Sequence, residues 1–194
     1  MTYESGVDLT VAPPARIPWF LRPALAIARR LTGKDPLPGR LLAHAPKAAL
    51  AAGLLEALSA HAPGDLDART LKLARLSASL VTGCPFCIDM NTAEYEAAGL
   101  DADAVAALHA GDDTPFDARE RAAIGLARAM SRTPAHVPAA VRADVAARFT
   151  PREVIVLVTV VAQVNYWARL NQALGVPALG FVYAPGDTTC SAPP

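Results

Sequence analysis

The sequence has little charge and few cysteines. Its 18 basic and 18 acidic side chains cancel, and charged residues make up only 19% of the chain. Without an excess of one sign, neither nucleic acid nor an anionic membrane is an expected partner. Hydrophobic residues make up 53% of the 194 residues, more than a monomer of this size usually buries, which favours a homo-oligomer.

No secretory signal or membrane span is expected from the sequence. The first ten residues contain Glu4 and Asp8 and have no basic region leading into an apolar one, so we expect a cytoplasmic protein. The most apolar run, Val154–Val164, has about half of the roughly 20 residues that a membrane span needs, and we interpret it as buried. With only three cysteines in a reducing compartment, a disulfide scaffold is not expected either.

Capping and breaking residues predict an all-α chain. Proline at first-turn positions, Asp or Thr at N-caps and glycine after the last turn mark the helix ends. The expected helices are 19–31, a short stretch ending near 44, 47–58, 68–82, 85–98, 102–110, 118–130, 138–148 and 151–174. Residues 34–40 form a connector.

Two of these helices have patterns that bear on function. In the helix after Asp67, three leucines lie on one face and Lys72, Arg75, Ser79 and Thr82 lie on the other, as a period of 3.6 residues requires. The valine-rich segment after Thr150 would also suit a strand, but its length and its cap favour a helix. Polar residues near its end are candidates for lining a pocket or a subunit contact: Asn165, Tyr166, Trp167, Arg169 and Asn171.

The segment Cys84-Pro85-Phe86-Cys87 is the main chemical signal. Cys84 is expected at a helix N-cap, with Pro85 at the first helical position and Cys87 one turn further on, so that the sulfurs can meet. Unpaired N–H groups and the helix dipole favour a thiolate there, and a second thiol can capture a sulfenic acid.

Two other interpretations of the pair remain open. The cysteines could be small buried packing residues, or half of a zinc site. A closed zinc site needs four ligands, and Cys190 and the four histidines offer no second pair at ligand spacing, so we expect no metal and no cofactor. We expect Cys190 to be a free surface thiol in the proline-rich tail.

The chain resembles the carboxymuconolactone decarboxylase superfamily, and within it the AhpD-like alkylhydroperoxidases. The segments that carry the resemblance are Gly83–Thr92, Gly99, Phe116–Ala122 and Phe149–Glu153. The resemblance implies an AhpD-like helical bundle over residues 41–180, preceded by an N-terminal arm and extension helix (1–40) and followed by an irregular tail (181–194). It also implies oligomers, and peroxide reduction in which Cys87 attacks and Cys84 resolves.

The chain departs from the family motif at two positions. The family has a glutamate twelve residues before the first cysteine and a histidine four residues after the second, which form a proton relay; Lys72 and Asn91 stand there in this chain. Neither is a base at neutral pH. Lys72 could favour the thiolate by its charge, Asn91 could bind peroxide or water, and His44 could reach the pair if the helices fold back.

The expected function is therefore a thiol-dependent peroxidase of the alkylhydroperoxidase type. Its substrate would be a small hydroperoxide, and an external dithiol protein would reduce the Cys84–Cys87 disulfide. Two alternatives remain: a non-catalytic oligomeric binding or scaffold protein, in which both cysteines are buried and unreactive, and an enzyme similar to carboxymuconolactone decarboxylase.

Overall fold

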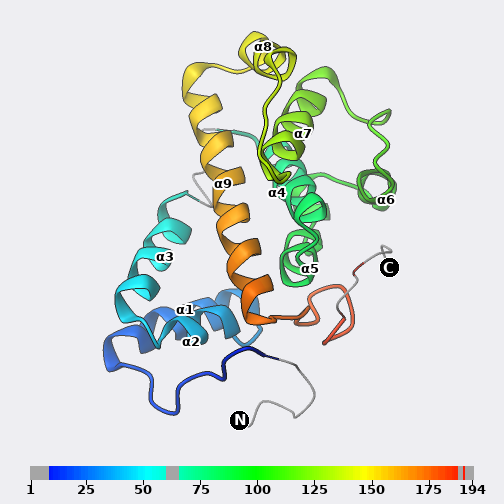
Figure 1. The fold of residues 1–194 in the computed structure, drawn as a ribbon. Helices are drawn as coiled ribbons and strands as arrows, with labels where there is room; N and C mark the ends of the chain where they lie inside the picture. The colour runs from blue at the N-terminus through cyan, green and yellow to red at the C-terminus, as the bar shows by residue number, and fades with distance from the viewer. Residues whose placement is uncertain (1–8, 60–65, 188–189, 191–194) are drawn as a thin grey trace.

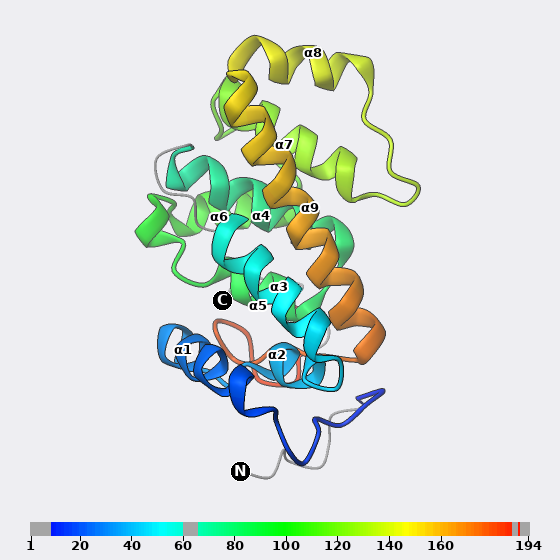
Figure 2. The same cartoon turned by 90° about the vertical axis from the view of Figure 1, so that its left-hand side faces the viewer.

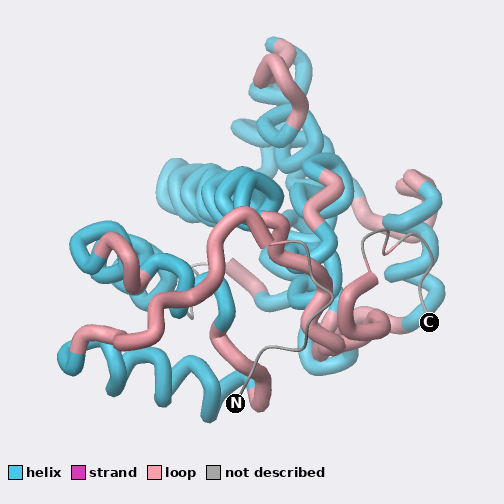
Figure 3. Tube along the Cα trace, turned by 60° about the horizontal axis from the view of Figure 1, so that its bottom comes forward, coloured by secondary structure: helices cyan, strands magenta, loops and turns pink. Residues whose placement is uncertain are grey.

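The computed structural model describes residues 9–59, 66–187 and 190, and within this part of the chain the secondary structure is entirely helical (Figures 1 and 3). The expectation of an all-α fold is confirmed. The α-helices are α1 (Arg22–Thr32), α2 (Leu37–Leu42), α3 (Pro46–Ser59), α4 (Ala68–Thr82), α5 (Pro85–Thr92), α6 (Ala102–Ala110), α7 (Ala118–Ser131), α8 (Ala139–Arg148) and α9 (Pro151–Leu174). Short 3-10 turns precede α1 (Trp19–Leu21) and α6 (Glu96–Ala98).

Side-chain caps set most of the helix starts. Asp67 and Asp101 each accept a hydrogen bond from the backbone N–H three residues on, and Asp117 and Thr150 form capping boxes with the glutamates of their first turns. Glycine at positive φ ends α4 at Gly83, where the chain must turn back toward α5. These caps confirm the predicted boundaries of α4, α6, α7 and α9.

Two predicted boundaries were wrong. The connector 34–40 contains the start of α2, because Pro38 fits the first turn of a helix and needs no N–H partner there. The helix after the cysteines ends at Thr92 and does not reach residue 98, since Ala93 is extended and Glu94 adopts a positive φ.

Helix α4 is the centre of the bundle and packs against α5, α7 and α9 (Figure 1). Its leucine face lies in an apolar cluster with α6 and α7, as expected. The opposite face carries polar residues and would be expected to face solvent, but it is covered as well, and Arg75, Ser79 and Thr82 are buried. Polar groups on a buried face need partners, so this face indicates a polar site inside the protein.

Helix α9 is the long apolar helix that the sequence predicts. At 24 residues, α9 is long and apolar enough to span a membrane. From the sequence we expected no membrane span, because only the run Val154–Val164 was considered. Helix α9 contacts α3, α4, α5, α7 and α8, and its most buried residues face these helices, so its contacts are those of a core helix.

The N-terminal extension lies at one end of the bundle. Figure 2 shows α1 and α2 together there, beside the loop that follows α9. Thr10 is bonded to the end of α9, through its N–H to Leu174 and its hydroxyl to Ala173. The extension therefore covers the end of the bundle where the cysteine helix α5 begins, and it forms part of the surroundings of the site.

Candidate active site

The cysteine pair lies at the start of α5, as predicted. Cys84 is the N-cap and its Sγ accepts a hydrogen bond from the N–H of Cys87, with 3.2 Å between the atoms. The two sulfurs are 2.6 Å apart, and both cysteines are free thiols. Both are also sealed from solvent, with 0% and 1% of their surface exposed. The geometry thus allows a disulfide after a small side-chain rotation.

The two thiols differ in acidity. The two sulfurs share a hydrogen bond, and the N–H groups of Cys87 and Phe86 point toward Cys84, so the pKa of Cys84 is lowered despite its burial. The pKa of Cys87 is raised, first by its hydrogen bond with Cys84 and second by burial. Ionisation of the pair is therefore favoured at Cys84 over Cys87.

A polar network connects α4 to the pair. Arg75 donates from Nε to the side-chain oxygen of Asn91 at 3.1 Å. Asn91 donates in turn to the hydroxyl of Ser79 and to the backbone oxygen of Cys87, both at 2.9 Å. The positive charge of Arg75 opposes the rise in the pKa of Cys87. Asn91 is thus a buried link that fixes Arg75 beside the thiols, and no hydrogen bond joins it to either sulfur.

A carboxylate from α3 completes this network. Glu56 accepts hydrogen bonds from Gln163 at 2.5 Å and from the indole N–H of Trp167 at 2.9 Å, and its other oxygen is 3.9 Å from a guanidinium nitrogen of Arg75. Burial lowers the pKa of Arg75, and Glu56 counteracts that shift. Glu56 is not among the residues predicted from the sequence, and Arg75 was assigned only to a polar face. The available signal was a glutamate within the otherwise apolar segment 48–58.

Asn171 reaches the pair from α9. Its amide nitrogen is 3.9 Å from the Sγ of Cys87, and it is fully buried. Its side-chain oxygen accepts no hydrogen bond from any described residue. An unpaired buried acceptor is costly, so this oxygen is free to accept a hydrogen bond from a group that enters the site. Asn171 and Trp167, both expected to line a pocket, do lie at the site.

The other two predicted auxiliary residues lie elsewhere. Lys72 donates from Nζ to the backbone oxygen of Ala93 at 2.6 Å, so it closes the C-terminal end of α5. His44 is exposed and its Nε2 is 2.9 Å from the backbone oxygen of Ala12 in the N-terminal arm. The proposed roles required Lys72 to face the pair and His44 to fold back onto it, whereas Lys72 is bonded at the C-terminal end of α5 and His44 is bonded to the N-terminal arm.

Two further residues tie the C-terminal loop to α5. Asp89 is fully buried and accepts five backbone N–H bonds, from residues 179–183, at 2.7–3.1 Å. Cys190, expected on the surface, is 1% exposed, with its Sγ 3.6 Å from the backbone oxygen of Pro85. Burial raises its pKa to about 12, so it is an inert thiol.

Among the described residues, no group of three or more His, Cys, Asp or Glu could hold a metal ion.

Comparison with known proteins supports the relationship that the motif suggests. The model of the carboxymuconolactone decarboxylase family matches residues 47–129. The uncharacterized protein YnjA of Escherichia coli (strain K12) is 30% identical over 178 residues, which cover 89% of this chain and 96% of YnjA.

Solved structures share the fold at low sequence identity. The debrominase Bmp8, in complex with 2,3,4-tribromopyrrole, superposes with a TM-score of 0.78 at 19% identity, covering 91% of this chain and 95% of its own. An uncharacterized peroxidase-related protein from Ralstonia eutropha JMP134, described as an alkylhydroperoxidase AhpD core, gives 0.74 at 18% identity, covering 98% and 100%. The fold is therefore AhpD-like, and the match to YnjA over nearly its whole length, with the family model, shows that the chain belongs to the carboxymuconolactone decarboxylase family.

Proposed function

We propose that the chain is a thiol-dependent peroxidase that reduces hydroperoxides with Cys84 and Cys87. The observation that carries the proposal is the arrangement of polar groups around two adjacent thiols: a bonded N-cap sulfur, the guanidinium of Arg75, and the unpaired oxygen of Asn171. Apolar packing needs none of these groups. A charge beside a thiol and an acceptor for a peroxide proton are what peroxide reduction uses.

In this proposal Cys84 does the work of the absent relay. As a thiolate, which its lowered pKa favours, Cys84 takes the proton of Cys87 across the 2.6 Å between the sulfurs. The resulting Cys87 thiolate, beside Arg75, attacks the terminal oxygen of the hydroperoxide, while that terminal O–H donates to Asn171. The O–O bond breaks, the terminal oxygen and its hydrogen stay on Cys87 as a sulfenic acid, and the alkoxide leaves as an alcohol with the proton that Cys84 had taken, which makes Cys84 a thiolate again.

The second half of the cycle uses Cys84 as the resolving thiol. Its sulfur attacks the sulfenic sulfur of Cys87, the S–O bond breaks, and water leaves as the disulfide forms. Two thiols and one hydroperoxide thus give a disulfide, an alcohol and water. An external dithiol protein then reduces the disulfide by thiol exchange, after local opening of the buried pair.

The burial of the pair favours a second candidate, a non-catalytic scaffold. Cys84 and Cys87 are as buried as that alternative requires. The two candidates differ in reactivity: a scaffold thiol stays unmodified by iodoacetamide at neutral pH in the folded protein, whereas a peroxidase thiol that opens to substrate is alkylated.

Exposed apolar side chains support the proposal of a homo-oligomer for either candidate. Trp19, Leu31, Ile27, Leu54 and Ile155 are each 58–78% exposed. Large apolar side chains are usually buried, and several of these exposed ones lie on α1 and α3. Light scattering of the purified protein measures the mass of the assembly.

Peroxide treatment of cysteine variants tests the catalytic proposal. In a Cys190→Ser background, one equivalent of organic hydroperoxide should convert both remaining thiols to a disulfide, read by mass spectrometry. Cys84→Ser removes both the base and the resolving thiol, so a sulfenic acid should form on Cys87 more slowly than in the parent and stay there for dimedone to trap; Cys87→Ser should give no such adduct at a comparable rate. Retention of both thiols in the parent, or unchanged peroxide turnover in either variant, would overturn the proposal.

A further inference from the structure

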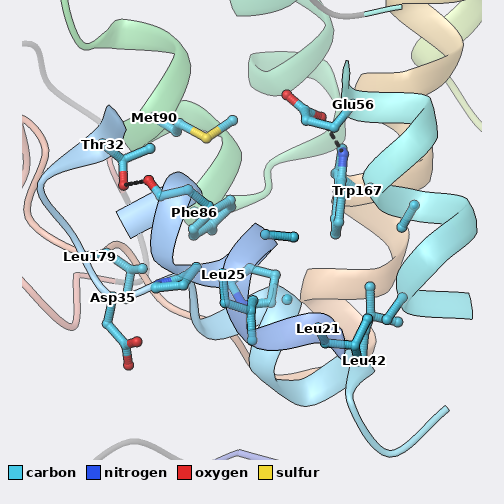
Figure 4. Close-up of a pocket in the computed structure, with 18 of the residues that line it drawn as sticks. Leu21, Leu25, Thr32, Asp35, Leu42, Glu56, Phe86, Met90, Trp167 and Leu179 are labelled. Atoms are coloured by element: carbon cyan, nitrogen blue, oxygen red, sulfur yellow. Dashed lines mark hydrogen bonds between the residues drawn. The ribbon is translucent and has the colours of Figure 1, made fainter. Parts of the chain in front are cut away.

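A pocket of about 230 Å³ lies between the N-terminal extension and the cysteine helix. Figure 4 shows Phe86 and Met90 of α5 on one side and Trp167 and Glu56 on the other, with Leu25 of α1 between them. The pocket exists because the facing helices carry small residues at i, i+3 and i+4 spacing. These are Ala24 and Ala28 on α1, and Ala49, Ala52 and Gly53 on α3.

The wall of the pocket is also part of the surroundings of the thiols. Cys84, Phe86 and Cys87 belong to one apolar cluster, against which Met90 and Trp167 pack. Met90 is also one helical turn from both Phe86 and Cys87. It is unbranched and flexible, so its side chain can adjust to a ligand in the pocket.

The chemistry of the lining selects an uncharged ligand. Most lining residues are apolar, and the charged ones are two acids, Asp35 and Glu56. Glu56 also accepts the indole N–H of Trp167 at 2.9 Å, which fixes a carboxylate at the wall. An anionic ligand would lose its hydration without a cation to replace it, because no described Lys or Arg lines the pocket and Arg40 and Arg75 already face Asp35 and Glu56. An apolar cavity of about 150 Å³ is known to hold benzene, so this pocket has room for a substituted single ring.

We propose that this pocket binds the organic part of the substrate, an uncharged group of about one substituted ring, and that it discriminates against carboxylate-bearing analogues. The identification of the ligand as a substrate rests on the proposed function, but the binding of an uncharged ring in the pocket does not depend on that function. The pocket is built partly by α1 and α2, so the extension, and not only the cysteine motif, determines which molecules reach the thiols.

A binding experiment tests the pocket without turnover. The chain has two tryptophans, and Trp19 is 78% exposed and outside the pocket, so Trp19→Phe leaves Trp167 as the fluorescent reporter. In that background, 2-phenyl-2-propanol should change the fluorescence in a saturable way, and 4-isopropylbenzoate should bind at least about tenfold more weakly. Equal binding of the two, or no response to the alcohol, overturns the proposal.

Filling the pocket provides a matched pair of variants. A Cβ on Gly53 would have no heavy atom within 4 Å, so Gly53→Leu places a side chain in the pocket without a clash. Gly125 on α7 has the same freedom away from the pocket, and Gly125→Leu is the control. Gly53→Leu should abolish the fluorescence response, and Gly125→Leu should keep it. Equal behaviour of the two variants, or a change of oligomeric mass in Gly53→Leu alone, contradicts a small-molecule pocket.

Oxidation rates separate this inference from the proposed function. In Gly53→Leu, thiol oxidation by cumene hydroperoxide should slow about tenfold or more relative to the control, while oxidation by hydrogen peroxide stays within about twofold. If the alcohol binds as expected but neither peroxide oxidises the thiols, the proposed function fails and the pocket stands. If both peroxides oxidise the thiols and Gly53→Leu slows neither, the pocket inference fails and the peroxidase stands.

Discussion

Replacing Asp89 by asparagine tests how α5 holds the C-terminal loop. The carboxylate accepts three N–H bonds on one oxygen, from residues 179–181, and two on the other, from residues 182 and 183. Asparagine keeps one oxygen and puts an NH₂ group where the other stood. At least two buried backbone N–H groups then face the NH₂ group of asparagine, which is a donor, and lose their acceptor.

The size of the effect follows from these lost bonds. Each buried donor left without an acceptor costs about 1–3 kcal/mol, and the remaining bonds lose the strength that a charged acceptor gives. We therefore expect Asp89→Asn to lower the free energy of unfolding by about 3–5 kcal/mol. For a chain of this length, each kcal/mol shifts the melting temperature by about 2–4 °C, so the expected decrease is about 6–20 °C.

Thermal and urea unfolding measure the global effect, and hydrogen exchange of residues 179–183 measures the local one. Asp103→Asn is the control, because Asp103 is exposed in the first turn of α6; it should cost less than about 1 kcal/mol. A loss below about 1 kcal/mol in Asp89→Asn, with unchanged exchange of these five amides, would refute the reasoning. A selective rise in exchange would show instead that the loop detaches on its own.

Two more predictions concern residues whose roles the structure revised. Lys72→Met should lower the free energy of unfolding by about 1–3 kcal/mol, because the bond to Ala93 is lost, and leave the alkylation rate of the pair unchanged; a large fall in that rate would place Lys72 at the thiols. Burial raises the pKa of Cys190 to about 12, whereas an unfolded thiol titrates near about 8.5, so its contribution to stability is complete below pH 8.5 and is lost as the pH rises toward 12. In unfolding titrations with reductant, Cys190→Ala should show a shallower decline than the parent above pH 9, and parallel curves would contradict the buried thiol.

The sequence by itself determined the helices and the position of the thiols. Caps such as Asp67, Asp101 and Thr150 act within one turn, so the helix that each begins could be predicted without knowing its neighbours. The spacing of Cys84 and Cys87 at a helix start is equally local, and it predicted their contact correctly. The break after Thr92 was missed, because a positive φ at Glu94 has no reliable signal in sequence.

Only the tertiary structure decided what surrounds the thiols. The period of α4 shows that Arg75 and Ser79 share a face, but not that α5 and α9 pack against this helix or that both residues are buried. Glu56 meets Arg75 across separate helices, and Asp89 meets a loop 90 residues away. Local rules do not reach such pairs, because burial is set by which elements pack together. Sequence spacing thus placed the two sulfurs at the start of a helix, whereas packing placed Arg75, Glu56 and the unpaired oxygen of Asn171 near them and formed the pocket beside them.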